Sequence, residues 1–387
     1  MPGSQTRTPV PGSASARSVP FRDLPRLHAI GADCSGAAVD AALASCDFGR
    51  PNGLIEAFEN DWAEFCGVKH AVATSSGSTA LLLAYLAHGI GPGDEIVTVP
   101  NTFVATAEAA LLLGATVRLV DIDAATHAID QQQAITALGP ATKVVVPLHP
   151  YGRLAQLGEL RAATAERGIA LIEEACHAHG ATRGGRMAGG FGDAAVFSFG
   201  PTKPLAGLGE GGAVVTDDDE LAARLRAWNN HGRDRGEHAR LGLNFRIHPI
   251  EAAYLTERLK LLPGMLAERR AIAERYNAAF APFGVVANPA VDDLSEHSFY
   301  VYVLDVPQRG RFRAALRAAG IGSDVHYPSA IHRQPAHRER FAAARLAACD
   351  TVQQHIVSLP MINGLRDDEA EHVIAATVRA LEEGTVA

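Results

Sequence analysis

The chain has 387 residues, of which 47% are hydrophobic and 20% charged, so it can bury a large core and form more than one lobe. Its formal net charge of -8 argues against nucleic acid as the main partner, because phosphate binding requires a basic face. We expect a soluble, globular protein that binds a small molecule.

Composition also bears on where the protein works. Residues 1–18 are rich in Pro, Ser and Arg and lack an apolar core, which predicts a disordered extension, with a transit peptide as the alternative. The five cysteines show no C-x-x-C spacing, as expected for unpaired thiols in a reducing cytoplasm. Apolar runs such as 109–115 are too short to cross a bilayer, so we expect no contact with a membrane.

From about residue 68, strand-like and helix-like segments alternate. Strands are predicted at His70–Thr74, 95–100, 116–121, 143–149 and 169–174, and helices at Ser78–Gly89, Val104–Leu113 and about 155–167. The strand segments are apolar throughout, which is typical of parallel strands buried on both faces. The pattern predicts an α/β fold with a mostly parallel, doubly wound sheet.

The second half of the chain changes character after a strand at Ala213–Thr216. Helices are predicted at Asp218–Asn230 and near Pro249–Leu262, followed by a strand at 297–306 and helices at Arg309–Ala319 and near Asp367–Glu383. We therefore divide the chain into the extension 1–18, a large cofactor-binding domain 19–263 and a small C-terminal α/β domain 264–387.

The segment T-S-S-G-S-T-A at 74–80 joins a predicted strand to a predicted helix. Small residues there leave backbone N–H groups free at the positive end of the helix, which suits a phosphate. An ordinary serine cap is the plainer alternative, and the local sequence alone favours it. The segment contains neither G-K-[ST] nor G-x-G-x-x-G, so it is no Walker loop or dinucleotide fingerprint.

The segment L-I-E-E-A-C-H-A-H-G-A at 171–181 begins as a buried strand and ends in carboxylates and imidazoles. Ligands bind at the carboxyl ends of parallel strands, so Glu173 and Glu174 are candidate site residues, although such a pair is usually surface charge. Cys176, His177 and His179 carry metal-ligating atoms, but no H-E-x-x-H or further ligand accompanies them. We predict no metal site.

Lys203 stands between a short apolar strand and a glycine-rich turn, in F-S-F-G-P-T-K-P-L-A-G-L-G-E-G-G at 197–212. A loop lysine is usually solvated, whereas an amine withdrawn from water has a lowered pKa and attacks carbonyl groups. With the anion cradle, the strand-end carboxylate and Phe103, this lysine completes the set that pyridoxal phosphate needs. That set is an amine, a carboxylate for the ring nitrogen, a cover for the ring and a helix N-terminus for the phosphate.

The order of these motifs resembles the DegT/DnrJ/EryC1/StrS aminotransferase family, the sugar-aminotransferase branch of the fold-type I pyridoxal phosphate enzymes. The resemblance extends from about Val19 to Leu381. Its strongest stretches are V-P-F-R-D-L, S-S-G-S-T-A-L, G-P-G-D-E-I, N-T-F-V-A-T-A, V-P-L-H-P-Y-G, E-E-A-C-H-A-H-G-A, S-F-G-P-T-K, G-E-G-G-A-V-V-T-D-D, N-H-G-R, G-L-N-F-R and V-H-Y-P. It implies a large domain with a sheet of the seven-stranded type and a smaller C-terminal α/β domain.

The resemblance implies catalytic and ring-binding roles. Lys203 would bind the cofactor as a Schiff base and shuttle the proton between substrate and cofactor. Glu174 would face the ring nitrogen, and His177 would lie near the phenolic oxygen. Phe103 would stack on one face of the ring and Ala175 would lie against the other.

The resemblance also implies residues for the phosphate and the substrate. The phosphate would be held by Gly77, Ser78, Thr79 and Ser198. Asn244, in G-L-N-F-R, would reach the phosphate in the other subunit, which implies a homodimer with shared active sites. The motifs that line the family's substrate cleft contain Tyr151, Arg233, His326 and Tyr327.

Two positions depart from the family pattern. The family usually has Glu-Asp where this chain has Glu173 and Glu174, so the carboxylate facing the ring is longer by one methylene. Gly200 stands where many members carry His or another bulky residue, which leaves more room near the reacting carbon.

The resemblance predicts a cytoplasmic aminotransferase of amino-sugar or antibiotic biosynthesis. L-glutamate or L-glutamine would donate the amino group to a ketone on a nucleotide-linked sugar or a cyclitol. One alternative is a dehydratase or another non-transaminating enzyme on the same scaffold; in dehydrating relatives a His replaces the lysine, so Lys203 argues for transamination. The other alternative is a regulatory or scaffold protein that has lost the chemistry, against which the intact Lys203, Ser198 and Asn244 weigh.

Overall fold

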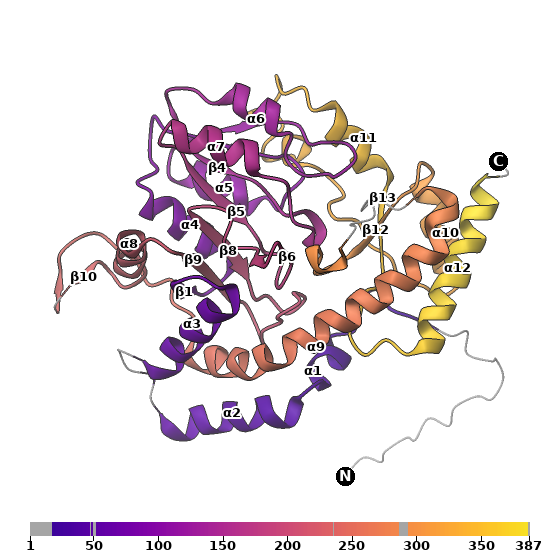
Figure 1. Ribbon diagram of the computed structural model, residues 1–387, viewed down its shortest axis with the longest axis horizontal. Helices are drawn as coiled ribbons and strands as arrows, with labels where there is room; N and C mark the ends of the chain where they lie inside the picture. The colour runs from indigo at the N-terminus through magenta and orange to yellow at the C-terminus, as the bar shows by residue number, and fades with distance from the viewer. Residues whose placement is uncertain (1–17, 47, 49–51, 235, 286–292, 386–387) are drawn as a thin grey trace, which may run out of the picture.

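A seven-stranded sheet forms the centre of the molecule in the computed structural model, which describes residues 18–46, 48, 52–234, 236–285 and 293–385 (Figure 1). Its order is β1-β9-β8-β5-β4-β2-β3. The strands are β1 (His70–Thr74), β2 (Glu95–Thr98), β3 (Thr116–Leu119), β4 (Thr142–Val146), β5 (Ala170–Glu174), β8 (Ala194–Ser198) and β9 (Gly212–Thr216). Strand β9 is antiparallel to its neighbours β1 and β8, and the other pairs are parallel. The predicted mostly parallel α/β sheet is confirmed.

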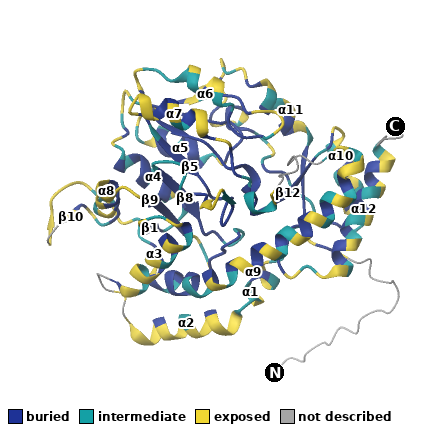
Figure 2. Ribbon diagram, in the orientation of Figure 1, coloured by how far each residue is buried: buried dark blue, intermediate teal, exposed yellow. Residues whose placement is uncertain are grey.

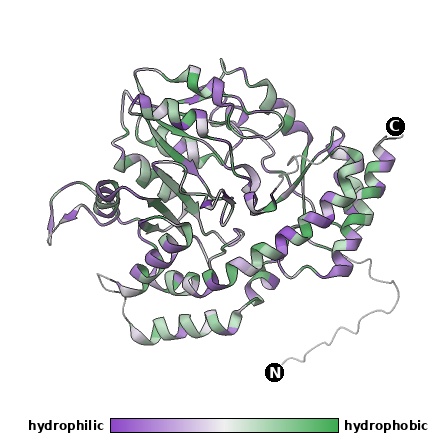
Figure 3. Cartoon of the chain, viewed as in Figure 1, coloured by the Kyte–Doolittle hydropathy of each residue, from purple (hydrophilic) through white to green (hydrophobic). Residues whose placement is uncertain are grey.

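Helices cover both faces of this sheet. One face, called the front face below, carries α4 (Gly77–Ala87), α5 (Ala105–Leu112) and α8 (Asp219–Asn229). The back face carries α3 (Gly53–Cys66), α6 (Gln131–Ala137), α7 (Gly158–Glu166) and the first half of α9 (Pro249–Phe280). Every residue of β2, β8 and β9 is buried, and the polar residues of these strands stand at their ends (Figures 2 and 3). Burial on both faces explains why the strand segments lack an alternating pattern.

Helix α4 begins where β1 ends, and its first turn is fixed by a capping box. The Ser76 hydroxyl accepts the Thr79 N–H at 3.1 Å, and the Thr79 hydroxyl accepts the Ser76 N–H at 2.9 Å. Gly77 is required at the next position, because a Cβ there would lie 2.8 Å from the Cβ of Ser198. The end of β8 therefore comes directly against the start of α4.

Helix α9 is longer than predicted, and it joins the two units of the chain. We expected it to end near Leu262, directly before Pro263, a residue that cannot donate a helical hydrogen bond. The helix instead continues through Pro263 to Phe280. Its second half buries side chains such as Tyr276 in the core of the C-terminal unit, and this burial offsets the missing bond. The expected boundary at 263/264 thus falls inside one continuous helix (Figure 1).

The C-terminal unit packs two antiparallel strands against helices. It contains β12 (Tyr302–Asp305), β13 (Ile356–Leu359), α10 (Arg309–Ala318) and α12 (Asp367–Thr385). Val19 joins this core through a parallel bridge to Ile321, so the start of the described chain belongs here and not with the central sheet. Of the predicted extension 1–18, residues 1–17 lie outside the described residues.

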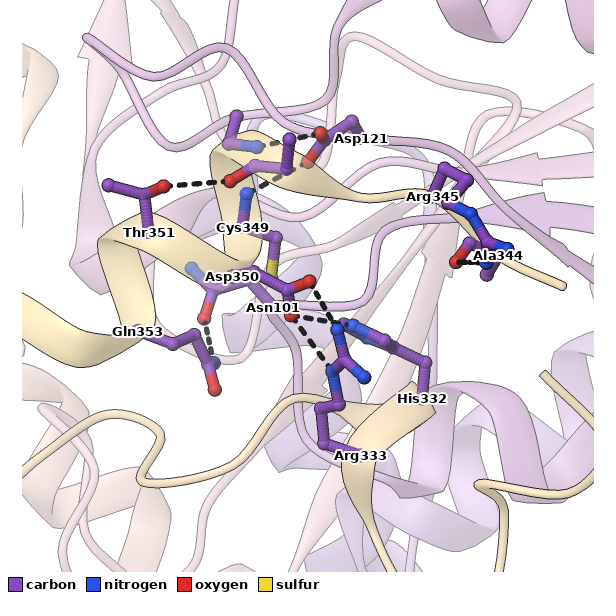
Figure 4. Close-up of polar contacts among 12 residues, drawn as sticks. Asn101, Asp121, His332, Arg333, Ala344, Arg345, Cys349, Asp350, Thr351 and Gln353 are labelled. Atoms are coloured by element: carbon purple, nitrogen blue, oxygen red, sulfur yellow. Dashed lines mark hydrogen bonds and ion pairs between the residues drawn. The ribbon is translucent and has the colours of Figure 1, made fainter. Parts of the chain in front are cut away.

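Part of the C-terminal stretch returns to the central sheet through α11 (Ala347–His355). The carboxylate of Asp121, which follows β3, accepts the N–H groups of Ala348 and Cys349 at 2.9 Å each and so caps this helix from another part of the chain (Figure 4). Gln353 Nε2 donates to Asn101 Oδ1 at 2.9 Å. These bonds hold α11 against the segments that follow β2 and β3.

The remaining elements are peripheral to the sheet. They are α1 (Leu24–Ala29), α2 (Ala32–Ser45) along the outside of α9, and the short strand pairs β6 (Thr182–Arg183) with β7 (Arg186–Met187) and β10 (Arg233–Asp234) with β11 (Glu237–His238). The β10–β11 arm projects away from the sheet beside α8 (Figure 1). No helix within the described ranges is both long and apolar enough to span a membrane.

Candidate active site

A cleft of about 460 Å³ opens at the carboxyl ends of β5 and β8, between the start of α4 and the loop at 324–328. We call it the Lys203 cleft. Open α/β sheets bind ligands at such strand ends, because the flanking loops diverge there. The cleft collects residues from both units of the chain.

Lys203 lies at the floor of this cleft. Its backbone N–H donates to the carbonyl of Gly200 at 2.9 Å, which forms a tight turn directly after β8. Its Nζ lies 4.6 Å from the ring centroid of Tyr300, over the aromatic face. Lys203 lines the cleft, and among the described residues it forms no ion pair with a carboxylate.

Glu174 is the last residue of β5 and lies on the front face, in the cleft. It is 5% exposed, and its carboxylate accepts the N–H of Cys176 at 3.3 Å. Burial raises the pKa of this carboxyl, and the nearby Cys176 and Lys203 offset only part of the effect. Glu173 points to the opposite face of the sheet, as strand geometry requires, and lies outside the cleft.

His177 lies against the wall of the cleft formed by the C-terminal unit. Its ring stacks on Tyr300 at a centroid distance of 4.4 Å, and its Nε2 lies 3.1 Å from the hydroxyl of Tyr327. Burial, together with the charge of Lys203, lowers the pKa of His177 well below its usual value, so the ring is neutral. Its Nδ1 is buried with no partner among the described residues, and a bound group with a polar oxygen would satisfy it.

The phosphate cradle is only partly as predicted. Gly77, Ser78 and Ser198 line the cleft. The first turn of a helix leaves N–H groups without intrahelical partners, which suits an anion at this end of α4. Thr79 does not line the cleft, and its N–H and its hydroxyl both bond to Ser76 in the capping box, so the structure gives its predicted contact with the phosphate no support.

The ring-covering pair also needs one correction. The ring of Phe103 is 56% exposed and borders the cleft, where it is available to cover a ligand. Ala175 is fully buried on the back face, packed in the core of Phe58 and Trp62, because side chains alternate across a strand. Cys176, which follows it, lies on the side of Glu174 and lines the cleft.

The predicted substrate residues divide into two groups. His326 and Tyr327 line the cleft. Tyr151 does not: it is 2% exposed, and its hydroxyl bonds His127 Nδ1 at 3.0 Å within the core behind the sheet. Arg233 is exposed on the β10–β11 arm, outside the cleft of its own chain.

Asn244 is also separate from the Lys203 cleft. It is exposed and lines another hollow of about 430 Å³, where its Oδ1 accepts from Arg246 at 2.7 Å. Within one chain, Asn244 therefore does not take part in the cleft.

Among the residues that line the cleft and that sequence reasoning missed are Arg22, Glu210 and Tyr300. Arg22 and Glu210 stand in motifs that carry the family resemblance, and this was the available signal. Tyr300 carries no such signal, because it lies in an ordinary apolar strand segment.

No group of three or more His, Cys, Asp or Glu side chains in the described part of the chain is placed to hold a metal ion. His179 Nε2 lies 3.0 Å from the carbonyl of Ser198, and its pKa is lowered to about 3 by burial and the charge of Lys203.

The geometry matches the needs of pyridoxal phosphate. An amine, a buried carboxylate with one backbone hydrogen bond, an uncovered aromatic ring and the start of a helix all border one cleft. The unpartnered Nδ1 of His177 adds a polar atom for the ring substituent. With a seven-stranded sheet of this order, these features define a fold-type I pyridoxal-phosphate-dependent transferase.

The chain belongs to the DegT/DnrJ/EryC1/StrS aminotransferase family, whose model matches residues 35–378. It is 36% identical over 304 residues to the UDP-2-acetamido-2-deoxy-3-oxo-D-glucuronate aminotransferase of Pseudomonas aeruginosa, covering 78% of this chain and 84% of the relative.

Solved structures agree with this assignment. The crystal structure of Streptomyces venezuelae DesV with a ketimine intermediate superposes with a TM-score of 0.88 at 34% identity, covering 94% of this chain and 99% of that one. The structure of NtdA from Bacillus subtilis, with the bound cofactor PMP, gives 0.87 at 26% identity over 94% of this chain and 85% of that one. The protein is a pyridoxal-phosphate-dependent aminotransferase.

Proposed function

We propose that this aminotransferase moves an amino group from L-glutamate or L-glutamine to a keto group on a nucleotide-linked sugar or a cyclitol. The single observation that supports it best is the placement of the Lys203 amine in one cleft with the buried Glu174 and the start of α4. The names of the relatives support a sugar acceptor.

Each part of the cofactor has a candidate partner in the cleft. The backbone N–H groups of Gly77 and Ser78, with the hydroxyl of Ser198, would hold its phosphate. Phe103 and Cys176 would enclose the ring from two sides. The bound cofactor supplies an electrophilic carbon and a ring that accepts electrons.

Lys203 is the residue that moves the proton. With the cofactor and the donor bound, its Nζ would remove the proton from the α carbon of the donor and later return one. Tyr300, whose ring face lies 4.6 Å from Nζ, keeps that amine at the floor of the cleft.

Glu174 would hold a proton against the ring nitrogen. Its burial makes an isolated negative charge costly, and a cationic ring nitrogen offsets this cost. His177, being neutral, offers Nδ1 to the ring substituent without adding a charge.

We also propose a cytoplasmic homodimer with shared active sites. Asn244 is exposed in the single chain, and Leu241 and Leu243 beside it are 81% and 49% exposed, which supports an interface at this segment. Arg233 is exposed on the adjacent arm and would reach the substrate from the partner in the same way. The unpaired state of all five cysteines agrees with a reducing compartment.

A two-stage experiment tests the function. Purified holoenzyme is first mixed with L-glutamate or L-glutamine without any ketone, and conversion to the pyridoxamine form is followed by absorbance. Candidate keto-sugars and cyclitols are then added, and the aminated product is identified by mass spectrometry. Absence of the first spectral change would contradict the proposal and favour the scaffold alternative, whereas a deoxygenated product without amination would favour the dehydratase. Sedimentation velocity tests the dimer.

A further inference from the structure

Arg22 lines the Lys203 cleft from a distant part of the sequence. It precedes α1, in V-P-F-R-D-L, and its side chain is solvent-exposed. The chain start reaches the cleft because Val19 is bridged to Ile321 in the C-terminal unit. No part of the cofactor has Arg22 as its candidate partner, so this arginine at the open side of the cleft is available for another role.

Two aromatic side chains hold the guanidinium group in place. Its Nη2 lies 3.0 Å from Nε2 of His326 and 3.4 Å from the hydroxyl of Tyr300. Arginine only donates, so Nε2 of His326 must accept and the ring hydrogen must sit on Nδ1, which donates to Ser358 Oγ at 2.9 Å. Burial lowers the pKa of His326 to about 4; the charges of Arg22 and Lys203 act in the same direction and Asp324 opposes them. Arg22 is thus held by neutral groups.

The charge of Arg22 has no carboxylate partner among the described residues. Asp324 lines the same cleft, but its Oδ1 accepts the N–H of Val325 at 2.9 Å. Tyr300 lies between Arg22 and Lys203: burial alone would raise the pKa of its hydroxyl, yet Lys203 and Arg22, with a bond to Thr202, lower it below its usual value. Arg22 and Lys203 thus bring two positive charges to the part of the cleft around Tyr300, where Asp324 is a nearby carboxylate.

A guanidinium that is held by neutral groups and lacks a counter-ion keeps donors available for an incoming anion. Its planar fork matches the two oxygens of a carboxylate or a phosphate. We propose that Arg22 forms an anion-binding subsite for a substrate, either for a carboxylate of the amino donor or for a phosphate of a nucleotide-linked acceptor. The proposal rests on the transamination proposed above.

Binding of unreactive probes to the holoenzyme tests the subsite. Glutarate represents the carboxylates of the donor, and UDP and dTDP represent the acceptor phosphates; each is titrated by calorimetry. Arg22→Met should weaken one of the two classes by about tenfold or more, and Arg22→Lys, which keeps the charge but not the fork, should weaken it less. The affected class identifies the source of the anion.

Arg340→Met is the matched control, because Arg340 is an exposed arginine outside the cleft. It should leave both affinities unchanged. Thermal unfolding of each variant at the wild-type temperature shows that the fold is retained. The subsite is overturned if neither class binds the wild type, or if Arg22→Met alters both affinities by less than twofold.

Failure of the Arg22 subsite can be distinguished from failure of the proposed transamination. If L-glutamate and L-glutamine both fail to convert the wild-type cofactor while glutarate or UDP still binds in an Arg22-dependent way, the transamination proposal fails and the subsite stands. If the cofactor is converted normally while the affinities of Arg22→Met and the wild type are equal, the subsite fails and transamination stands.

Discussion

Glu173 and Glu174 are neighbours in the chain, yet their carboxylates lie on opposite faces of the sheet and differ in the number of their hydrogen-bond donors. Behind the sheet, the Glu173 carboxylate accepts from His149 Nε2 at 2.8 Å and from three backbone N–H groups, those of Gly189 at 2.9 Å and of Phe191 and Gly192 at 2.7 Å. In front, Glu174 accepts one backbone N–H, at 3.3 Å.

The difference separates a carboxylate whose acceptor sites are filled from one that is available to a ligand. His149 Nδ1 accepts the N–H of Ala155 at 3.0 Å, so its ring hydrogen is on Nε2 and points at Glu173. Every lone-pair direction of Glu173 is thereby used, and no capacity remains for a ligand. Most of the acceptor sites of the Glu174 carboxylate have no donor and lie in an open cleft. A bound cationic group could therefore donate to them.

Glu59, on α3 at the back of the sheet, is an intermediate case. Its Oε1 accepts the N–H of Ala73 at 2.8 Å, but no imidazole supports it. Burial raises the pKa of Glu59 to about 7, against the smaller opposing effects of that bond and of Arg226. A carboxylate that is withdrawn from water and has few donors, such as the half-buried Glu59 or the buried Glu174, thus becomes easier to protonate, on either face.

The largest expected effect is on the front face. Lys203→Ala removes the amine that binds the cofactor and moves the proton, so turnover should fall by at least about 10⁴-fold. The Schiff-base absorbance should disappear with it. Lys69→Ala, at an exposed lysine beside β1, should change neither. A Lys203→Ala enzyme that kept both colour and activity would contradict the assignment.

Glu173→Gln should damage the fold rather than the chemistry. The amide loses one acceptor oxygen and places an NH₂ group against N–H donors, so we expect a loss of about 3 to 5 kcal/mol in the free energy of unfolding. Denaturant titration of the variant measures it. An unchanged unfolding midpoint would show that this carboxylate is dispensable for stability.

Glu174→Gln should give the opposite result. The free energy of unfolding should stay within about 1 kcal/mol or rise, because the variant removes a buried ionisable group. The rate of the first half-reaction should fall by about 10² to 10³-fold, since the ring nitrogen loses its counter-charge. Glu174→Asp, which retains the carboxylate, should recover most of that rate. Equal losses in both variants would mean that the charge is not what matters.

The smallest expected effect concerns Glu59→Gln. The pKa of Glu59 is about 7 in the folded state and near its ordinary 4.5 in the unfolded state, so between these values the folded state binds a proton that the unfolded state lacks. Stability therefore falls as pH rises through this window, and the Gln variant should not share the fall. The difference between the two unfolding free energies should grow by about 1 to 3 kcal/mol from pH 5 to pH 8. A constant difference across that range would contradict the raised pKa.

Patterns within short segments of the sequence were enough to predict many of the strands, helices and site residues. The strands from β1 to β5 and the helix at α4 lie where apolar runs and small-residue turns place them, because each is a local pattern of a few residues. The cradle at Gly77 and Ser78 and the lysine after β8 are equally local. The prediction of Ala175 beside the ring was wrong, because side chains alternate along β5 and Cys176 is the one that lies on the side of Glu174.

Features that depend on contacts between distant parts of the chain could not be predicted from the sequence. Pro263 indicated the end of a helix, but burial of the residues beyond it kept α9 continuous. Tyr151 follows a strand that ends at the cleft, yet its hydroxyl turns back to His127 inside the core. In both cases the free energy of packing outweighs the local preference, and packing partners cannot be read from neighbouring residues.

By itself, the sequence determined the order of elements, the parallel sheet and the amine, carboxylate and cradle that pyridoxal phosphate requires, since each depends on residues close together in the chain. The tertiary structure alone decided which side chains share the cleft with them. Arg22 meets Tyr300 and His326 across 278 and 304 positions of sequence. Hydrophobic burial brings the two units together without regard to sequence distance, and so Arg22 lines the same cleft as Lys203.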